Sequence, residues 1–84
     1  MSRQLYIKYI NRIGSTESLP VGLALKMMRK SNKMTIKSTS LKLKIHRNTL
    51  SNYERNITKV PYRIFVKCVK LYGVKIVEIF FKSD

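Results

Sequence analysis

Apolar side chains recur at helical spacing over much of the chain after residue 18. After Pro61, for example, Phe65, Cys68, Val69 and Tyr72 fall at positions i, i+3, i+4 and i+7, on one side of an α-helix. Residues that typically begin or end helices divide the rest of the pattern into segments long enough to form a helix. The chain is therefore predicted to be all-α, with five helices at about residues 19–30, 36–43, 47–55, 61–72 and 76–80.

Residues with cap chemistry lie at the expected helix ends. Ser18 and Thr35 are expected N-caps because their hydroxyls can accept from the first backbone N–H groups of a helix. Asn56 and Gly73 are expected to end helices, since both tolerate a positive φ. His46, before the third helix, is a poor cap by this criterion.

Residues 1–18 are expected to form an N-terminal arm in front of a domain at residues 19–84. Leu5, Ile7 and Tyr9 alternate with other residues in a way that favours a short β-strand. A helix with Tyr6, Tyr9, Ile10 and Ile13 on one side is the alternative. A lone strand is unstable, so it would need a partner, such as the same segment of a second copy.

The segment from Ile45 to Ile57 has two chemically distinct sides when it is drawn as a helix. Its apolar side would hold Ile45, Leu50, Tyr53 and Ile57. The opposite side carries guanidinium, carboxamide and hydroxyl groups, from Arg47, Asn48, Ser51, Asn52 and Arg55. An ordinary solvated face is the simpler interpretation. However, arginine pairs with guanine and asparagine with adenine in the DNA major groove, which offers a functional one.

The charge of the chain favours the functional interpretation. The 84 residues include 18 Lys and Arg but only 4 Asp and Glu, which gives a net charge of +14. Self-repulsion of this size is relieved by a polyanion, so nucleic acid is the leading partner. An anionic membrane surface or an acidic protein is the weaker alternative. The sequence has no apolar run long enough to span a membrane.

The residues that support catalysis and metal binding are few. Cys68 is the only cysteine, so no internal disulfide is possible, which fits a reducing cytoplasm. Cys68 is expected to be a small core residue. One His and one Cys do not provide a spaced set of metal ligands. We therefore expect no catalytic site, no metal and no cofactor.

The order and spacing of residues 21–80 resemble the lambda-repressor-like (Cro/repressor, or Xre) helix-turn-helix family. The residues in register with that family are Val21-Gly22, Leu25, Met28-Arg29-Lys30, Met34-Thr35, Leu43, Ile45, Arg47, Thr49-Leu50-Ser51, Tyr53-Glu54, Lys59, Gly73-Val74 and Glu78-Ile79-Phe80. The resemblance implies a five-helix domain whose third helix enters the major groove of double-stranded DNA.

The same resemblance implies a role for each matching residue. Arg47, Asn48 and Asn52 match base-reading positions, with Ser51 nearby. The residues expected near phosphates are Thr35, Lys37, Lys44, His46, Arg55, Asn56 and Lys59.

Arg29 and Glu54 match a structural pair, and the charge pattern supports this independently. Glu54 is the only acid among ten Lys and Arg residues between positions 26 and 59, so we expect it to turn inward.

Three residues depart from the family pattern. Ile36 stands where a Gln often contacts phosphate. Lys44 replaces the turn Gly, which requires a positive φ at a residue with a side chain. Thr39 replaces a core Leu, which either loosens the packing of the second helix or lets a neighbour such as Leu41 compensate.

The sequence thus predicts a sequence-specific transcriptional regulator, a repressor acting as a homodimer on a palindromic operator in a bacterial or phage-type cytoplasm. One alternative is an antitoxin-like autorepressor that also binds a partner protein through residues 1–14. The other is a basic nucleic-acid binder without sequence preference.

Overall fold

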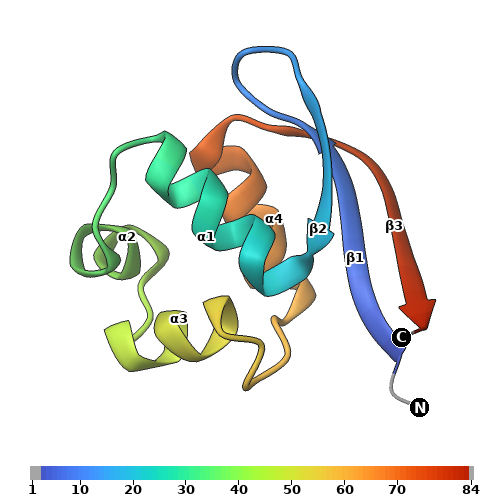
Figure 1. Cartoon of the computed structure of the whole chain (residues 1–84). Helices are drawn as coiled ribbons and strands as arrows, with labels where there is room; N and C mark the ends of the chain where they lie inside the picture. Colours follow the sequence, from blue (N-terminus) through green and yellow to red (C-terminus); the bar gives the residue numbers. More distant parts are fainter. Residues whose placement is uncertain (1–2, 84) are drawn as a thin grey trace.

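The computed structural model describes residues 3–83 and combines helices with a sheet (Figure 1). Its elements in chain order are β1 (Arg3–Ile10), β2 (Thr16–Pro20), α1 (Val21–Ser31), α2 (Ile36–Leu43), α3 (Arg47–Glu54), α4 (Tyr62–Tyr72) and β3 (Lys75–Ser83). The all-α prediction is therefore wrong, because four helices and three strands form within the described residues. Residues 1 and 2 of the expected arm, and Asp84, lie outside these residues.

The three strands form one antiparallel sheet in the order β2-β1-β3. The predicted N-terminal strand is present, and it is the central strand. Ile7 pairs with Leu19 of β2 on one side and with Ile79 of β3 on the other. Both strands that pair with β1 thus belong to the same chain. The sequence, in contrast, suggested pairing with the same segment of a second copy.

The expected last helix at residues 76–80 is strand β3. Ile76 and Ile79 have a spacing that suits a helix, but a β-bulge produces the same spacing in this strand. The register shifts between Lys8 and Tyr9, so that Tyr9 pairs with Ile76 while Ile7 pairs with Ile79. The extra residue in β3 puts both isoleucines on the side of the sheet that faces the helices. The β-branched and aromatic residues of this segment also favour a strand.

The chain before α1 also differs from the prediction. Thr16–Pro20, expected to be the end of the arm and the start of a helix, pairs with β1 as strand β2. The helix α1 consequently begins at Val21 rather than at Leu19, and Pro20 occupies the N-cap position instead of Ser18. Because Ser18 pairs with Lys8 within the sheet, it does not cap the helix.

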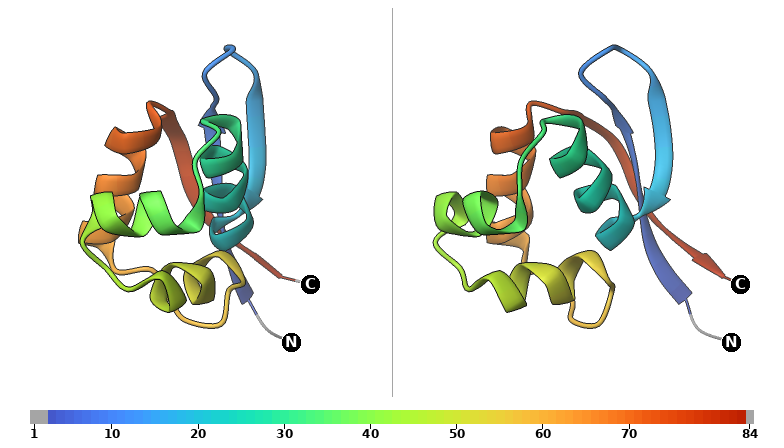
Figure 2. Two further views of the ribbon diagram at one scale, coloured as in Figure 1. Left: turned by 90° about the vertical axis from the view of Figure 1, so that its left-hand side faces the viewer. Right: turned by 60° about the vertical axis from the view of Figure 1, so that its left-hand side comes forward.

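The four helices lie on one side of the sheet, and within residues 3–83 no element covers the other side (Figures 1 and 2). The core forms where helices and sheet meet, and β1 contributes Ile7 and Tyr9 to it. The helices contribute the other large, fully buried side chains, which are Leu25, Met28, Leu43, Leu50, Ile64 and Tyr72. The expected core position of Cys68 is confirmed, since its side chain is fully buried.

Leu41 does not take the compensating place that was one alternative for it, and the expected place of Ile57 on the apolar side of α3 is wrong. Leu41 is 69% exposed and so does not compensate for Thr39, which is itself fully buried. The side chain of Tyr72 in α4, which is also buried, lies close to Thr39. Ile57 is 60% exposed because the chain leaves the helix at Arg55, before Ile57 could reach the apolar side of α3.

The helix ends mostly agree with the sequence. The Thr35 side chain accepts a hydrogen bond from the backbone N–H of Ser38 at 3.0 Å, as an N-cap does. Lys44, Asn56 and Gly73 have φ values of 59°, 59° and 67°, so all three end their helices in the left-handed region. No helix among residues 3–83 has the length and apolar character needed to cross a bilayer.

Candidate nucleic-acid interface

The connection between α2 and α3 sets the direction in which α3 points. Lys44 ends α2 in the left-handed conformation, and the N–H of Ile45 donates to the carbonyl of Ser40 at 3.0 Å. His46 then caps α3, because its Nδ1 accepts from the N–H of Asn48 at 3.1 Å. The expectation that His46 is a poor cap is wrong: an unprotonated ring nitrogen can accept here as a Ser or Asp oxygen does.

The helix α3 has a buried side and an accessible side. Leu50, Tyr53 and Glu54 are buried against the rest of the protein. Arg47 and Asn48 are exposed, as is Arg55 directly after the helix, while Ser51 and Asn52 are partly exposed. The five residues expected to form the polar side are thus accessible on one short helix and its cap. We call these five residues the α3 face.

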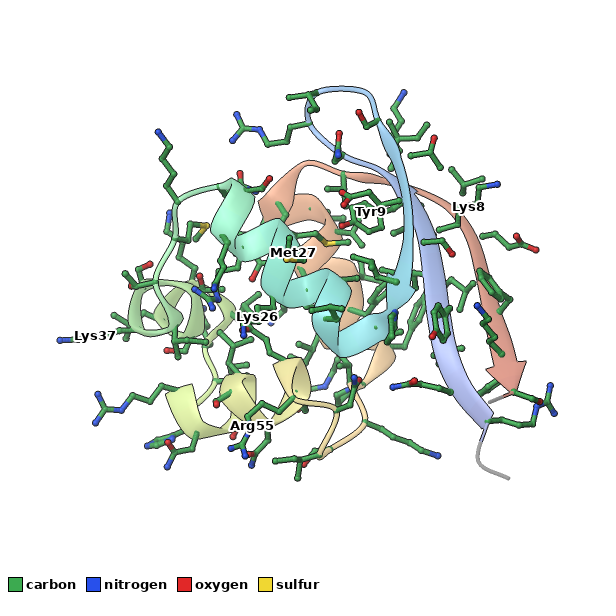
Figure 3. All side chains as sticks on the ribbon, in the orientation of Figure 1. Lys8, Tyr9, Lys26, Met27, Lys37 and Arg55 are labelled. Carbon is green, nitrogen blue, oxygen red and sulfur yellow. The ribbon has the colours of Figure 1, made fainter. Side chains whose placement is uncertain are left out.

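Exposed cationic side chains lie on α2 and on the segments before and after α3. Lys37, Lys44 and Lys59 are exposed, and Figure 3 shows Lys37 projecting outward from α2 and Arg55 lying beneath α3. The described chain has three acids: Glu54 is buried, and Glu17 and Glu78 belong to the sheet. No exposed carboxylate between residues 3 and 83 therefore lies on α2 or α3, and the surface around the α3 face can attract a polyanion.

A buried ion pair joins α1 to α3. Arg29 Nε donates to Glu54 Oε2 at 2.8 Å and Arg29 Nη2 donates to Glu54 Oε1 at 3.1 Å, with only 9% and 4% of the two side chains exposed. Arg29 Nη1 also donates to the Met34 carbonyl at 2.8 Å, which ties in the loop before α2. The hydrogen bond to Glu54 raises the pKa of Arg29, although burial acts against it. The expected pair is formed, and it fixes α3 against α1.

A second link between α1 and α3 was not expected from the sequence. Asn56 Oδ1 accepts from the backbone N–H of Gly22 in the first turn of α1 at 3.1 Å. At Gly22 there is no room for a side chain, since a Cβ would lie 2.5 Å from both Asn56 Oδ1 and the Tyr53 carbonyl oxygen. A glycine in a helical first turn was the only signal. The carboxamide oxygen of Asn56, expected near phosphate, is thus used inside the protein.

Replacing Gly22 with alanine is expected to lower the free energy of unfolding by about 1–3 kcal/mol, as overpacking in a filled site does. The clash with the Tyr53 carbonyl outweighs the helix propensity of alanine, worth roughly 1 kcal/mol. Urea unfolding followed by circular dichroism measures the change. Ala24, in the same helix, offers the control: Ala24→Gly removes a Cβ without any clash. An unchanged or more stable Gly22→Ala protein would contradict the close contact.

The described residues hold no group of three or more His, Cys, Asp or Glu side chains that could bind a metal. Burial, with a contribution from Glu54, raises the pKa of the Cys68 thiol to about 12. The thiol therefore stays protonated at neutral pH, and a protonated thiol is a poor nucleophile.

Comparison with known proteins connects this geometry to a family. A family model described as helix-turn-helix matches residues 25–79, which include α2, α3 and the connection between them. No curated protein and no solved structure matches the chain.

Proposed function

Because the chain belongs to the lambda-repressor-like (Cro/C1-type) helix-turn-helix family of DNA-binding regulators, we propose that it recognises a specific DNA sequence through α3. The observation that carries this proposal is the α3 face: an accessible set of guanidinium, carboxamide and hydroxyl groups on a helix held by the Arg29–Glu54 pair. A helix of this size fits the major groove, where such groups distinguish base pairs.

In the proposed complex, Arg47, Asn48 and Asn52 contact base edges, with Ser51 beside them. Arg47 is at the first turn of α3, the end that contacts bases in helix-turn-helix proteins. The two asparagines can each pair with an adenine through both the oxygen and the nitrogen of the carboxamide.

Phosphate contacts would hold the protein in register on the duplex. The residues proposed for this role are Thr35, Lys37, Lys44, His46, Arg55, Asn56 and Lys59. His46 accepts the hydrogen bond from the N–H of Asn48 through Nδ1, which leaves Nε2 to donate to a phosphate oxygen. In Asn56, the bond to Gly22 uses Oδ1, which leaves the amide nitrogen as the donor.

We further propose that the protein acts as a homodimer and represses by occupying a palindromic operator. A two-fold symmetric dimer matches symmetric half-sites about one helical turn, roughly 34–36 Å, apart. The alternative with a protein partner bound through residues 1–14 has weaker support. This alternative was based on the apolar residues of the segment, but two of them, Ile7 and Tyr9, are buried in the core of the same chain.

Two alanine variants separate base reading from phosphate binding. Arg47→Ala is expected to cost about 1–3 kcal/mol on the preferred sequence and to relax specificity at one base position. Lys59→Ala is expected to weaken binding to all duplexes alike and to reduce the salt dependence of binding. Fluorescence anisotropy on the preferred duplex and on a scrambled one, at several salt concentrations, measures both effects. Equal losses for both variants on every duplex would favour a binder without sequence preference.

A further inference from the structure

The outer edge of β3 is long and apolar. Within residues 3–83, β3 pairs with β1 on one edge only, so its other edge presents unpaired backbone N–H and C=O groups along Lys75–Ser83. Ile79 and Phe81 of this strand are 47% and 58% exposed. Both line an apolar groove of about 550 Å³ between the sheet and the α3–α4 connection. An exposed edge of this kind is a template for pairing with another strand.

We propose that the outer edge of β3 pairs antiparallel with β3 of a second copy, with the two-fold axis at Phe80. This inference rests on the homodimer proposed above and names the surface that forms it. The interface is isologous: the same strand of both copies would join two three-stranded sheets into one continuous sheet. Both helical layers would then lie on the same side of that sheet.

Charge complementarity selects this register. When Phe80 lies opposite Phe80 of the second copy, Glu78 of each copy lies opposite Lys82 of the other. The dimer therefore contains two Glu78–Lys82 pairs. Glu78 already has Lys8 opposite it on β1, so each Glu78 would be flanked by one lysine from each copy. Centring the axis on Glu78 would oppose the two carboxylates, and centring it on Ile79 or Phe81 would oppose Lys82 to an apolar residue. Like charges directly opposite destabilise strand pairs, whereas opposite charges stabilise them.

The apolar residues also match in this register. On the side facing away from the helices, Tyr6 stacks on Phe80 with ring centroids 5.7 Å apart. Because Phe80 would lie beside Phe80 of the second copy, the Tyr6 and Phe80 rings of both copies would form one row of four aromatic rings. On the helix side, Phe81 pairs with Leu5 of its own chain and would lie opposite Ile79 of the second copy. The partly exposed residues of β3 would thus be covered by equivalent residues of the second copy.

A charge reversal tests the pairing without DNA, which keeps its outcome separate from that of the proposed DNA recognition. Lys82→Glu would place two carboxylates opposite each other twice per dimer. We expect the dimer dissociation constant to rise about tenfold or more. The substitution lowers the net charge of +14 by two, which by itself would favour association. Sedimentation equilibrium at fixed salt measures the constant.

Two further variants complete this test. Adding Glu78→Lys to Lys82→Glu exchanges the two charges and restores the net charge. It should bring the dissociation constant well below that of Lys82→Glu, although not fully to the original value, because the new lysine would also lie opposite Lys8 of its own chain. Lys75→Glu is the matched control, because it makes the same charge change outside the paired segment and should leave the dimer intact. A monomeric original protein, or a double variant that associates as weakly as Lys82→Glu, would overturn the proposed pairing.

Cross-linking tests the position of the axis. Only the residue on the axis lies opposite itself, so Phe80→Cys should form a disulfide-linked dimer under mild oxidation. Ser83→Cys should not, since the two copies of this residue would be far apart at opposite ends of the pairing. The buried Cys68, with its raised pKa, contributes little background. Linking through Ser83→Cys but not through Phe80→Cys would overturn this register.

Discussion

Replacing Glu54 with alanine is expected to lower the free energy of unfolding by about 3–5 kcal/mol, the usual cost of removing one partner of a buried ion pair. The carboxylate receives two hydrogen bonds from Arg29, and only 4% of the Glu54 side chain is exposed. Without it, Arg29 would keep the Met34 carbonyl as a partner but would be a buried charge with no counterion. Thermal and urea unfolding of the two proteins measure the loss.

The double variant Arg29→Met/Glu54→Leu is the control for that prediction. It removes both charges and fills their space with apolar atoms, so it should be clearly more stable than Glu54→Ala. If Glu54→Ala unfolds within about 1 kcal/mol of the original protein, the pair does not fix α3 against α1.

Replacing Leu50 with alanine is expected to cost about 2–5 kcal/mol, through lost burial and the cavity that remains. Leu50 is fully buried and is the most buried residue of α3, so the same change should loosen the α3 face. Urea unfolding measures stability. Proton–deuterium exchange of the α3 amides measures the loosening, which we expect to exceed that of α4.

Leu41→Ala provides the matched control, because the same atoms are removed from a side chain that is 69% exposed on the neighbouring helix. Its free energy of unfolding should change by no more than about 0.5 kcal/mol. Similar losses for the two variants would contradict the burial of Leu50 in α3 and the exposure of Leu41 on α2.

Much of the helical part could be predicted because local signals agree with tertiary packing. The bounds of α2 match the prediction, since Thr35 and Lys44 mark its two ends through a cap and a left-handed φ. The inward turn of Glu54 could also be predicted, because an exposed carboxylate among so many cations would oppose polyanion binding.

Only the central strand of the sheet, β1, could be predicted, because β2 and β3 depend on their pairing with β1. The spacing of the apolar residues does not distinguish a bulged strand at residues 75–83 from a short helix, since the bulge gives Ile76 and Ile79 a helical spacing. The β-branched and aromatic residues were the local signal for a strand. Strand β2 contains Ser18 and Pro20, which resemble the start of a helix until β1 is placed beside them.

The contact between Gly22 and Asn56 likewise joins residues 34 positions apart and leaves no periodic trace in the sequence. Packing of α1 against the end of α3 is what brings the two residues together.

Selection of bound duplexes from a random pool tests the central claim, sequence recognition through the α3 face, most directly. The original protein should enrich a two-fold symmetric consensus, and Asn48→Ala or Asn52→Ala should lose the preference at matching positions in both half-sites. A bound pool as random as the starting pool, despite tight binding, would contradict it.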